Sequence, residues 1–164
     1  MDGDVEAKAK VDAKVDAGVT FSHIGICVGD LDRALTFYCE GLGFDLVQSH
    51  TVGPEFGPLM ELDEVALQSR FVRRDGVSIE LLHFDSPGHR GQAERRPMNQ
   101  LGLTHLSLRV SDVDVIAERI ESLGGSVIRS TRTAFGAAGS ADAFDFVYCT
   151  DPDGTRVELM HLPR

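Results

Sequence analysis

Two short stretches decide the fold: "DGVSIELLHF" at residues 75–84 and "DGTRVELMHL" at residues 153–162. Asp, Gly, Glu, Leu and His fall in register between them, and most other positions are conservative exchanges. Each stretch places a carboxylate in the middle of an apolar run, Glu80 in the first and Glu158 in the second. Because a charged side chain in such a run is costly to bury without a partner, its repetition points to a function.

The repeat extends towards the N-terminus of each stretch. "HIGICVGDLDRALTFYCEGLGF" begins at His23, and "HLSLRVSDVDVIAERIESLGGS" begins at His105. Both consist of a His, an alternating apolar segment, two Asp residues and a helical pattern that reaches Leu-Gly. His105 follows His23 by 82 positions, and Glu158 follows Glu80 by 78. The chain from 21 to 162 is therefore interpreted as one unit used twice.

Each unit predicts the order β-α-β-β-β and hence an α+β fold. The first unit is expected to contain a helix that begins after Asp30, a good N-cap, and strands near 21–28, 44–49, 66–73 and 77–84. The second is expected to contain a helix at 112–123 and strands near 103–110, 125–130, 143–149 and 155–162. The predicted segments are a flexible tail at 1–20, a first module at 21–84, a polar linker at 85–102 and a second module at 103–164.

Composition excludes several functional classes. A formal net charge of −10 argues against nucleic-acid binding, and no apolar run approaches the ~20 residues of a membrane helix. The first residues lack the apolar segment of a secretory signal. Three cysteines without C-x-x-C spacing argue against a disulfide framework and predict a reducing cytoplasm, with Cys27, Cys39 and Cys149 as small buried apolar residues.

Strand alternation places one His and one Glu of each unit on a common face. Apolar residues such as Ile79 and Leu81 are expected to face the helix, so Glu80 points the other way. The same alternation holds for both histidines and for Glu158. Each unit therefore presents one His and one Glu on the surface that its helix leaves uncovered, and a concave sheet would let the four converge.

A metal ion is the interpretation that best explains this pattern. Gathering carboxylates in a cavity is costly unless a cation offsets their charge. Two imidazoles and two carboxylates suit one divalent ion such as Zn²⁺, Ni²⁺, Co²⁺, Mn²⁺ or Fe²⁺, and we predict His23, Glu80, His105 and Glu158 as its ligands. Each of these residues alone is more often an ordinary strand residue; the duplication favours a metal site.

The remaining histidines carry less information. His83 and His161 also repeat, but they lie on the face opposite the glutamates and are interpreted as structural. His50 and His89 have no counterpart and are not assigned a role.

Four arginines are candidates for contact with an anionic group. Arg109 and Arg156 fall on the predicted metal face and either bind substrate or pair with surface acids. Arg95 and Arg96 lie in the polar linker, where they are either solvated or placed beside an anionic substrate.

These motifs resemble the vicinal oxygen chelate superfamily, which includes glyoxalase I, methylmalonyl-CoA epimerase, extradiol dioxygenases and bleomycin- and fosfomycin-resistance proteins. The resemblance covers about 21 to 162 and rests on "HIGICVGDLDRALTFYCEGLGF", "GLTHLSLRVSDVD" and "DPDGTRVELM". It implies paired modules that form a U-shaped mixed sheet around one metal ion, with the same four ligands. It also implies a small-molecule substrate with adjacent oxygens and a site formed either within one chain or across a homodimer.

The branches of this superfamily resemble the chain to different degrees. Glutathione-dependent glyoxalase I has Arg where this chain has Cys27 and Asn where it has Phe84. Methylmalonyl-CoA epimerase usually has Gln at the position of Glu80. Extradiol dioxygenases use a 2-His-1-carboxylate iron site, and resistance proteins that only sequester a drug lack the ligands. "RPMNQLGLTHLSLRV" followed by "DPDGTRVELMH" is similar to cyclitol epimerases of the 2-epi-5-epi-valiolone type.

The resemblance implies proton abstraction beside a carbonyl. Metal chelation of an α-hydroxyketone through both oxygens would stabilise an enediolate, with Glu80 or Glu158 as the catalytic base. The leading prediction is an epimerase or isomerase. The alternatives are a glyoxalase I-type lyase, a non-catalytic small-molecule binding protein and, less favoured, an Fe(II) extradiol dioxygenase.

Overall fold

The computed structural model describes residues 18–137, 140 and 142–163, so the predicted tail at 1–20 lies almost entirely outside the described residues. The first module contains β1 (Ile24–Cys27), α2 (Leu31–Leu35), the π-helix η1 (Thr36–Gly41), β2 (Asp45–Val52), the 3₁₀ turn η2 (Pro54–Phe56), α3 (Gly57–Met60), β3 (Ala66–Arg74) and β4 (Val77–Ser86). The second contains β5 (Leu106–Arg109), α4 (Val113–Ser122), β6 (Ser126–Phe135), β7 (Phe144–Thr150) and β8 (Arg156–His161).

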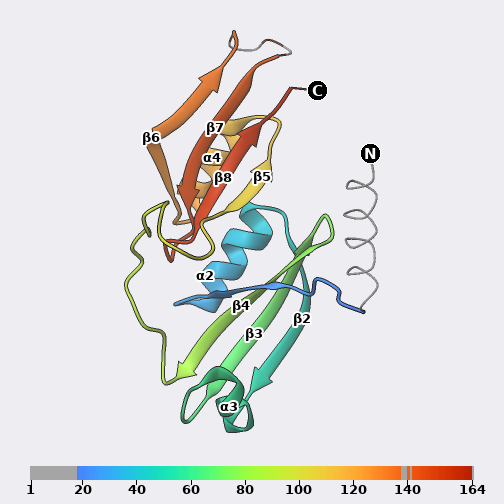
Figure 1. Ribbon diagram of the computed structural model, residues 1–164, viewed down its shortest axis with the longest axis vertical. Helices are drawn as coiled ribbons and strands as arrows, with labels where there is room; N and C mark the ends of the chain where they lie inside the picture. Colours follow the sequence, from blue (N-terminus) through green and yellow to red (C-terminus); the bar gives the residue numbers. More distant parts are fainter. Residues whose placement is uncertain (1–17, 138–139, 141, 164) are drawn as a thin grey trace, which may run out of the picture.

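Each module forms its own four-stranded mixed sheet, with strand orders β1-β4-β3-β2 and β5-β8-β7-β6 (Figure 1). One pair in each sheet is parallel, β1 with β4 and β5 with β8, whereas the remaining pairs are antiparallel. The predicted α+β class and the duplicated β-α-β-β-β order are confirmed. Within one chain the strands form two sheets, so β1 and β5 each keep one edge without a partner strand among the described residues.

Matching caps start the main helix of each module. The Asp30 side chain accepts a hydrogen bond from the backbone N–H of Arg33 at 2.8 Å. The Asp112 side chain accepts from the N–H groups of Asp114 and Val115 at 2.9 and 3.1 Å. Both aspartates have an extended backbone, and their side chains accept from N–H groups of the first helical turn that would otherwise lack partners. The repeated Asp thus fixes where each chain turns from strand to helix.

The first helix differs from the regular helix that its sequence predicts. After Leu35 it widens into η1, in which the N–H of Leu42 donates to the carbonyl of Phe37, five residues earlier. Phe37 and Tyr38 are neighbours in sequence, yet both are completely buried. Gly43 then adopts a φ of +72°, a left-handed conformation that favours glycine, and ends the helical segment.

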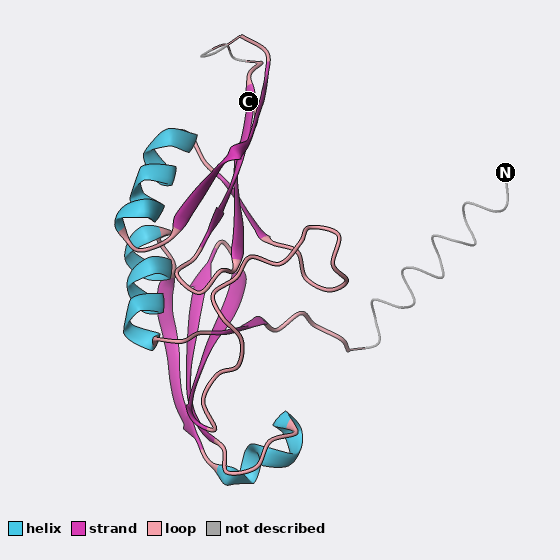
Figure 2. Cartoon of the chain, turned by 90° about the vertical axis from the view of Figure 1, so that its left-hand side faces the viewer, coloured by secondary structure: helices cyan, strands magenta, loops and turns pink. Residues whose placement is uncertain are grey.

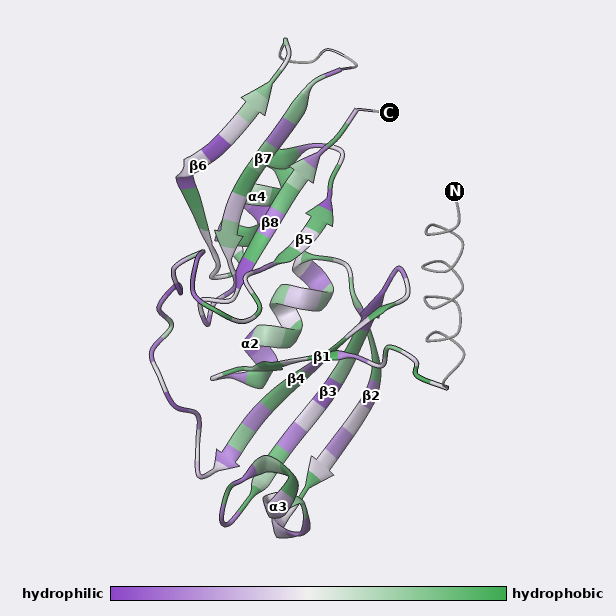
Figure 3. Cartoon of the chain, in the orientation of Figure 1, coloured by the Kyte–Doolittle hydropathy of each residue, from purple (hydrophilic) through white to green (hydrophobic). Residues whose placement is uncertain are grey.

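Strand alternation separates a core face from an open face, which we define as the sheet face that α2 or α4 does not cover. Hydrophobic and hydrophilic residues alternate along β4 and β8 (Figure 3). Ile79 and Leu81 on β4 and Val157 and Leu159 on β8 are buried against the helices, as predicted. Cys149 is buried as expected, but Cys27 is exposed because it falls on the open face. All three cysteines are free thiols.

The main helices of the two modules, α2 with η1 and α4, lie on the same side of the two sheets (Figure 2). η1 packs against the end of α4, where a Cβ on Gly41 would approach Leu123 Cδ1 to 2.8 Å. Gly125 is equally restricted, because a Cβ there would lie 2.8 Å from the Phe37 ring. These glycines allow the two modules to share one continuous apolar core.

A polar contact also joins the modules. The buried hydroxyl of Tyr38 donates to Asp151 Oδ2 at 2.9 Å, across the boundary between η1 and the turn before β8. Asp153 in the same turn pairs with Arg33 at 2.7 Å and accepts from the N–H of Gly29 at 3.2 Å. The "DPDG" turn of the second module is therefore anchored on the first module.

One element was not predicted. Between β2 and β3 the chain forms η2 and α3, which lie on the side of the first sheet opposite α2 (Figure 2). Pro54 occupies the first position of η2, where its lack of an N–H has no cost. The turns are too short to produce a helical apolar period. None of the described helices is long and apolar enough to span a bilayer.

We expect Tyr38→Phe to weaken the contact between the modules in a pH-dependent way. Burial raises the pKa of the Asp151 carboxyl, and the Tyr38 hydroxyl opposes that rise by favouring the ionised form. The variant should lose about 2 kcal/mol of unfolding free energy at about pH 7, where Asp151 is ionised. The loss should shrink at about pH 4, as pH falls through the raised pKa and the carboxyl becomes protonated.

Urea unfolding at both pH values measures this difference. Ser122→Ala is the control, because the Ser122 hydroxyl donates to the carbonyl of Arg119, a neutral acceptor that does not titrate. Equal losses for Tyr38→Phe at the two pH values would contradict the assignment.

Candidate metal centre

The first His–Glu pair consists of His23, which directly precedes β1, and Glu80 on the neighbouring strand β4. Gly25 on β1 is the register partner of Glu80, so His23 reaches the carboxylate from two positions earlier. His23 Nε2 lies 3.1 Å from Glu80 Oε2, and His23 Nδ1 lies 2.9 Å from Ser22 Oγ. The Ser69 hydroxyl on β3 donates to Glu80 Oε1 at 2.5 Å. Both side chains are therefore held at two points.

The second His–Glu pair, His105 and Glu158, repeats this arrangement. His105 Nε2 lies 3.5 Å from Glu158 Oε2, and His105 Nδ1 lies 2.9 Å from Thr104 Oγ1. Ser107 on β5 is the register partner of Glu158, and its hydroxyl donates to Glu158 Oε2 at 2.7 Å. The duplication in sequence is thus matched by a duplication in side-chain geometry.

An aromatic ring lies against the histidine of each pair. Phe71, opposite Glu80 in register, meets the His23 ring edge-on with centroids 5.0 Å apart. Tyr148 occupies the equivalent position in the second sheet, 5.3 Å from the ring of the second-pair histidine. Both rings restrict the orientation of the neighbouring imidazole, but only Tyr148, in the second module, also carries a phenol hydroxyl.

The phenol interacts with its surroundings. Burial, followed by the charge of Glu158 and a hydrogen bond to it, raises the pKa of Tyr148, whereas Arg156 opposes that rise. The Arg156 guanidinium lies over the Tyr148 ring, 5.1 Å from its centroid. The second pair therefore has a more polar environment than the first.

The structure does not gather the two pairs in one chain. Across the described ranges, no three side chains of the His, Cys, Asp or Glu type lie close enough to hold a metal ion. His23 meets Glu80, and His105 meets Glu158, but neither pair reaches the other. Each pair supplies one imidazole and one carboxylate, which is half of the predicted ligand set. The four-ligand site itself stays a prediction.

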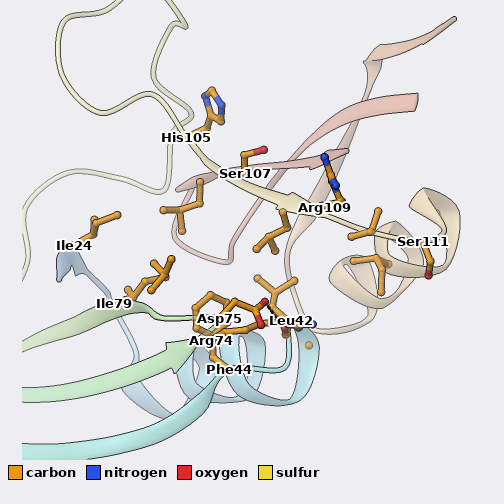
Figure 4. A pocket seen from close by; sticks show the side chains of 16 residues that line it. Ile24, Leu42, Phe44, Arg74, Asp75, Ile79, His105, Ser107, Arg109 and Ser111 are labelled. Atoms are coloured by element: carbon orange, nitrogen blue, oxygen red, sulfur yellow. Dashed lines mark hydrogen bonds and ion pairs between the residues drawn. The ribbon is translucent and has the colours of Figure 1, made fainter. Parts of the chain in front are cut away.

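A cleft of about 560 Å³ lies between the modules (Figure 4). Ile24, Ile79 and Phe44 line it on the side of the first module. His105, Ser107, Arg109 and the apolar residues of β5 line it on the side of the second. The cleft touches the second pair through its histidine but contacts neither residue of the first pair.

The two predicted substrate-binding arginines occupy different environments. Arg109 is exposed on the open face of β5 and lines the cleft, as Figure 4 shows. Arg156 precedes Glu158 by two residues on β8, shares its open face and is only 7 % exposed. The placement on the predicted face is as expected, while the burial of Arg156 was not foreseen.

The other histidines also divide as the sequence indicated. His83 Nδ1 lies 3.3 Å from the carbonyl oxygen of Val28, and His161 Nδ1 lies 3.2 Å from that of Val110. These matched contacts tie the last strand of each module to the end of its first strand, which is a structural role. His50, left unassigned, packs edge-on against the ring of Phe71 with centroids 5.8 Å apart.

Sequence reasoning missed the residues that orient the two pairs. Ser22 and Thr104 directly precede the two histidines, so this repeated hydroxyl was available as a signal. Ser69 and Ser107 reach the glutamates from different strands in the two modules and occupy no matched sequence position. Only strand register reveals that they perform the same task.

Comparison with known proteins places this geometry in a family. The family model described as the Glyoxalase/Bleomycin resistance protein/Dioxygenase superfamily matches residues 20–159. A 2-epi-5-epi-valiolone epimerase from an Actinomyces species is 28% identical over 155 residues, covering 91% of this chain and 82% of that protein. A probable lactoylglutathione lyase from Synechocystis is 28% identical over 138 residues, covering 84% of this chain and 92% of the other.

Solved structures show the same fold at lower identity. A glyoxalase family protein from Bacillus cereus superposes with a TM-score of 0.72 at 20% identity and covers 90% of this chain and 99% of its own. A glyoxalase I variant from Zea mays has a TM-score of 0.64 at 24% identity; the match covers 96% of this chain and half of the maize chain. The matched family model and the duplicated fold agree: the chain belongs to the glyoxalase/bleomycin resistance protein/dioxygenase superfamily.

Proposed function

We propose that this protein is a divalent-metal-dependent epimerase or isomerase that removes a proton next to a carbonyl of a small molecule. The observation that carries the proposal is the duplicated, pre-oriented His–Glu pair. Four ligands come from two copies of the same arrangement: His23 with Glu80, and His105 with Glu158. The relatives named as an epimerase and as lactoylglutathione lyases support enzyme chemistry of this superfamily.

The donor set fits a divalent cation. With a proton on Nδ1, each histidine donates to the adjacent Ser22 or Thr104 hydroxyl and keeps the Nε2 lone pair directed towards its glutamate. Imidazole and carboxylate together suit Zn²⁺, Ni²⁺, Co²⁺, Mn²⁺ or Fe²⁺. When bound, such an ion would polarise two neighbouring substrate oxygens and offset the negative charge that develops during proton removal.

We further propose that two copies of the chain complete each site. The His23–Glu80 pair of one subunit would face the His105–Glu158 pair of the partner subunit, and a two-fold axis would generate two such sites. The free edges of β1 and β5 support this arrangement. So do the residues just before them: Phe21 and Leu103 occupy equivalent positions in the two modules and are 75% and 74% exposed.

Further exposed apolar residues precede β1 and β5. Val19 and Leu101, two positions further back, are also equivalent and are 78% and 94% exposed. Large apolar side chains exposed at matched positions of both modules indicate a surface that an identical partner buries. A second copy offers the complementary module to each.

The chain's own residues then perform the proton transfer. Glu80 or Glu158 accepts the proton from the carbon next to the carbonyl, and the electron pair left on that carbon moves onto the carbonyl oxygen. Return of the proton to the opposite face inverts the carbon, and return to the neighbouring carbon isomerises the molecule. Two glutamates from opposite halves provide a base on either side. Arg109 and Arg156 are proposed to bind the substrate from the open face of the second module.

A glyoxalase I-type lyase is the second candidate. Four relatives named as probable, putative or assigned lactoylglutathione lyases, 28–29% identical, favour it. Against it, the resemblance to glutathione-dependent enzymes fails at Cys27 and Phe84. A non-catalytic protein that binds a small molecule is the third candidate. It would keep the same His–Glu pairs but would not convert its ligand.

Metal content tests the proposed donor set. Protein purified without chelator should hold about one transition-metal ion per chain. Loss of an outer partner of a metal ligand typically lowers affinity about 10–100-fold, so Glu80→Gln or Glu158→Gln should cost at least that much. Elemental analysis and calorimetric titration provide the measurement, with Glu118→Gln on the exposed side of α4 as control. A wild-type protein that takes up none of Ni²⁺, Zn²⁺, Co²⁺ or Mn²⁺ would refute the site.

Subunit mixing tests the shared site. His23→Ala and His105→Ala dimers should each lack every intact site, because each site needs both histidines. In a mixed dimer, one site would lose both histidines and the other would keep all four ligands. Co-expression should therefore restore about half a metal ion per chain in the mixed species, given one site per pair of complementary modules. If each site lies within one chain, mixing restores nothing.

Proton exchange tests the chemistry. With metal bound, α-hydroxyketones incubated in heavy water should gain deuterium at the carbon next to the carbonyl, and either glutamate variant should lose most of this exchange. Mass spectrometry follows the label, and the glutathione hemithioacetal of an α-ketoaldehyde serves as the lyase substrate. Exchange and product formation only with the hemithioacetal would support the lyase. Binding without any exchange would support a non-catalytic binding protein.

A further inference from the structure

The second module contains a buried arginine with no acidic partner. Arg156 is 7 % exposed, and among the described residues no carboxylate lies within ion-pair distance of it. Its Nη2 donates to the carbonyl oxygen of Arg96 at 2.6 Å, which is a neutral acceptor. Burying a guanidinium without an anion is costly, so the fold retains a cost that a ligand would remove.

Part of this guanidinium remains available. No hydrogen bond within the described chain uses Nε or Nη1 of Arg156. Every fully buried side-chain nitrogen or oxygen in the same residues has a partner, so these two nitrogens still reach open space. The Tyr148 ring supports the guanidinium plane from one side. Together with the second N–H of Nη2, either Nε or Nη1 gives a pair of adjacent N–H groups, which is suited to bidentate recognition of an oxyanion.

A second cation lies next to the first. The carbonyl oxygen of Arg96 accepts the hydrogen bond from Arg156, and Arg95 directly precedes Arg96 in the linker. The linker that carries Arg95 packs directly on the turn before β8, where a Cβ on Gly154 would come within 2.9 Å of the Ala93 carbonyl carbon. Gly154 has a φ of +87°, so both its conformation and this contact require glycine. The linker is therefore held beside Arg156.

The first module has no arginine at the position that matches Arg156. Ser78 stands where the second module has Arg156, and its hydroxyl accepts from Arg73 Nε at 3.0 Å. The second module therefore carries its guanidinium on β8 itself, whereas in the first module the guanidinium of Arg73 reaches Ser78 from β3. Arg156 lies on the open face two residues from Glu158, next to the predicted metal ligands.

We propose that Arg156 and Arg95 form an anion subsite that binds a phosphate or carboxylate group of the substrate. This inference rests on the proposed function, because it takes the neighbouring His–Glu pairs as the reaction centre. It defines the substrate as a small molecule that carries vicinal oxygens at one end and an oxyanion at the other. The subsite would orient the substrate so that its reacting carbon faces the glutamates.

Anion binding to metal-free, full-length protein tests this subsite. Inorganic phosphate and acetate are titrated separately, by calorimetry, at constant ionic strength. We expect one of them to bind, and the one that binds identifies the oxyanion class. Arg156→Gln should weaken that binding at least about tenfold, and Arg156→Lys by less, because lysine keeps the charge but loses the fork. Arg129→Gln, which alters an exposed ion pair with Glu121, is the control and should bind as wild type does.

Arg95→Gln is the second variant and is needed if Arg156→Gln fails to fold. It leaves the bond from Arg156 to the Arg96 carbonyl intact and should weaken anion binding about threefold, as expected for one partly solvated charge. The inference is overturned if wild-type protein binds neither anion, or if Arg95→Gln and any folded Arg156 variant bind as tightly as wild type. Metal titration of the same samples separates the two proposals. Anion binding without metal binding rejects the metal enzyme and keeps the subsite, and the reverse result rejects only the subsite.

Discussion

Parallel pairing of β1 with β4 and of β5 with β8 determines where the candidate metal ligands lie. In this register Gly25 lies opposite Glu80, and Ser107 lies opposite Glu158, so each histidine meets its glutamate on the open face. A slip by one residue would turn the glutamate into the apolar core. The buried residues on the other face, such as Leu81, hold the register because they cannot leave the core without losing their burial. Folding of each module therefore brings its own histidine and glutamate together.

Duplication made much of this predictable. The repeated Asp caps, the alternating strands and the His–Glu spacing each appear twice, and a repeated signal is stronger than a single one. The edge strands were harder to predict: β6 continues to Phe135 through a register shift after Ile128, although the prediction ended at 130. Its later residues are mostly exposed, so burial leaves no apolar pattern there. The π-helical turn and α3 depend on tertiary packing and short-range geometry, which periodicity does not report.

The site was predictable in its chemistry but not in its completeness. Sequence identifies the residue types and the face, yet the distance between the two pairs depends on how the modules pack. Here Tyr38 and Asp151 join the modules through the helix side, which leaves the two pairs apart in one chain. The two modules also carry different residues at equivalent positions, where the repeat predicts similar ones. Phe71 becomes Tyr148, and Ser78 becomes Arg156, which gives one half of the site the polar contacts that would distinguish a substrate's two ends.

In the proposed dimer, two half-sites from two chains hold one metal ion. Anomalous X-ray diffraction from crystals grown with Mn²⁺ or Co²⁺ is the decisive measurement, because the signal locates the ion and its ligands together. We expect a single strong peak per site between subunits, bound by His23 and Glu80 of one chain and by His105 and Glu158 of the other. An ion bound by one His–Glu pair and solvent alone, or no anomalous peak at either pair, would contradict it.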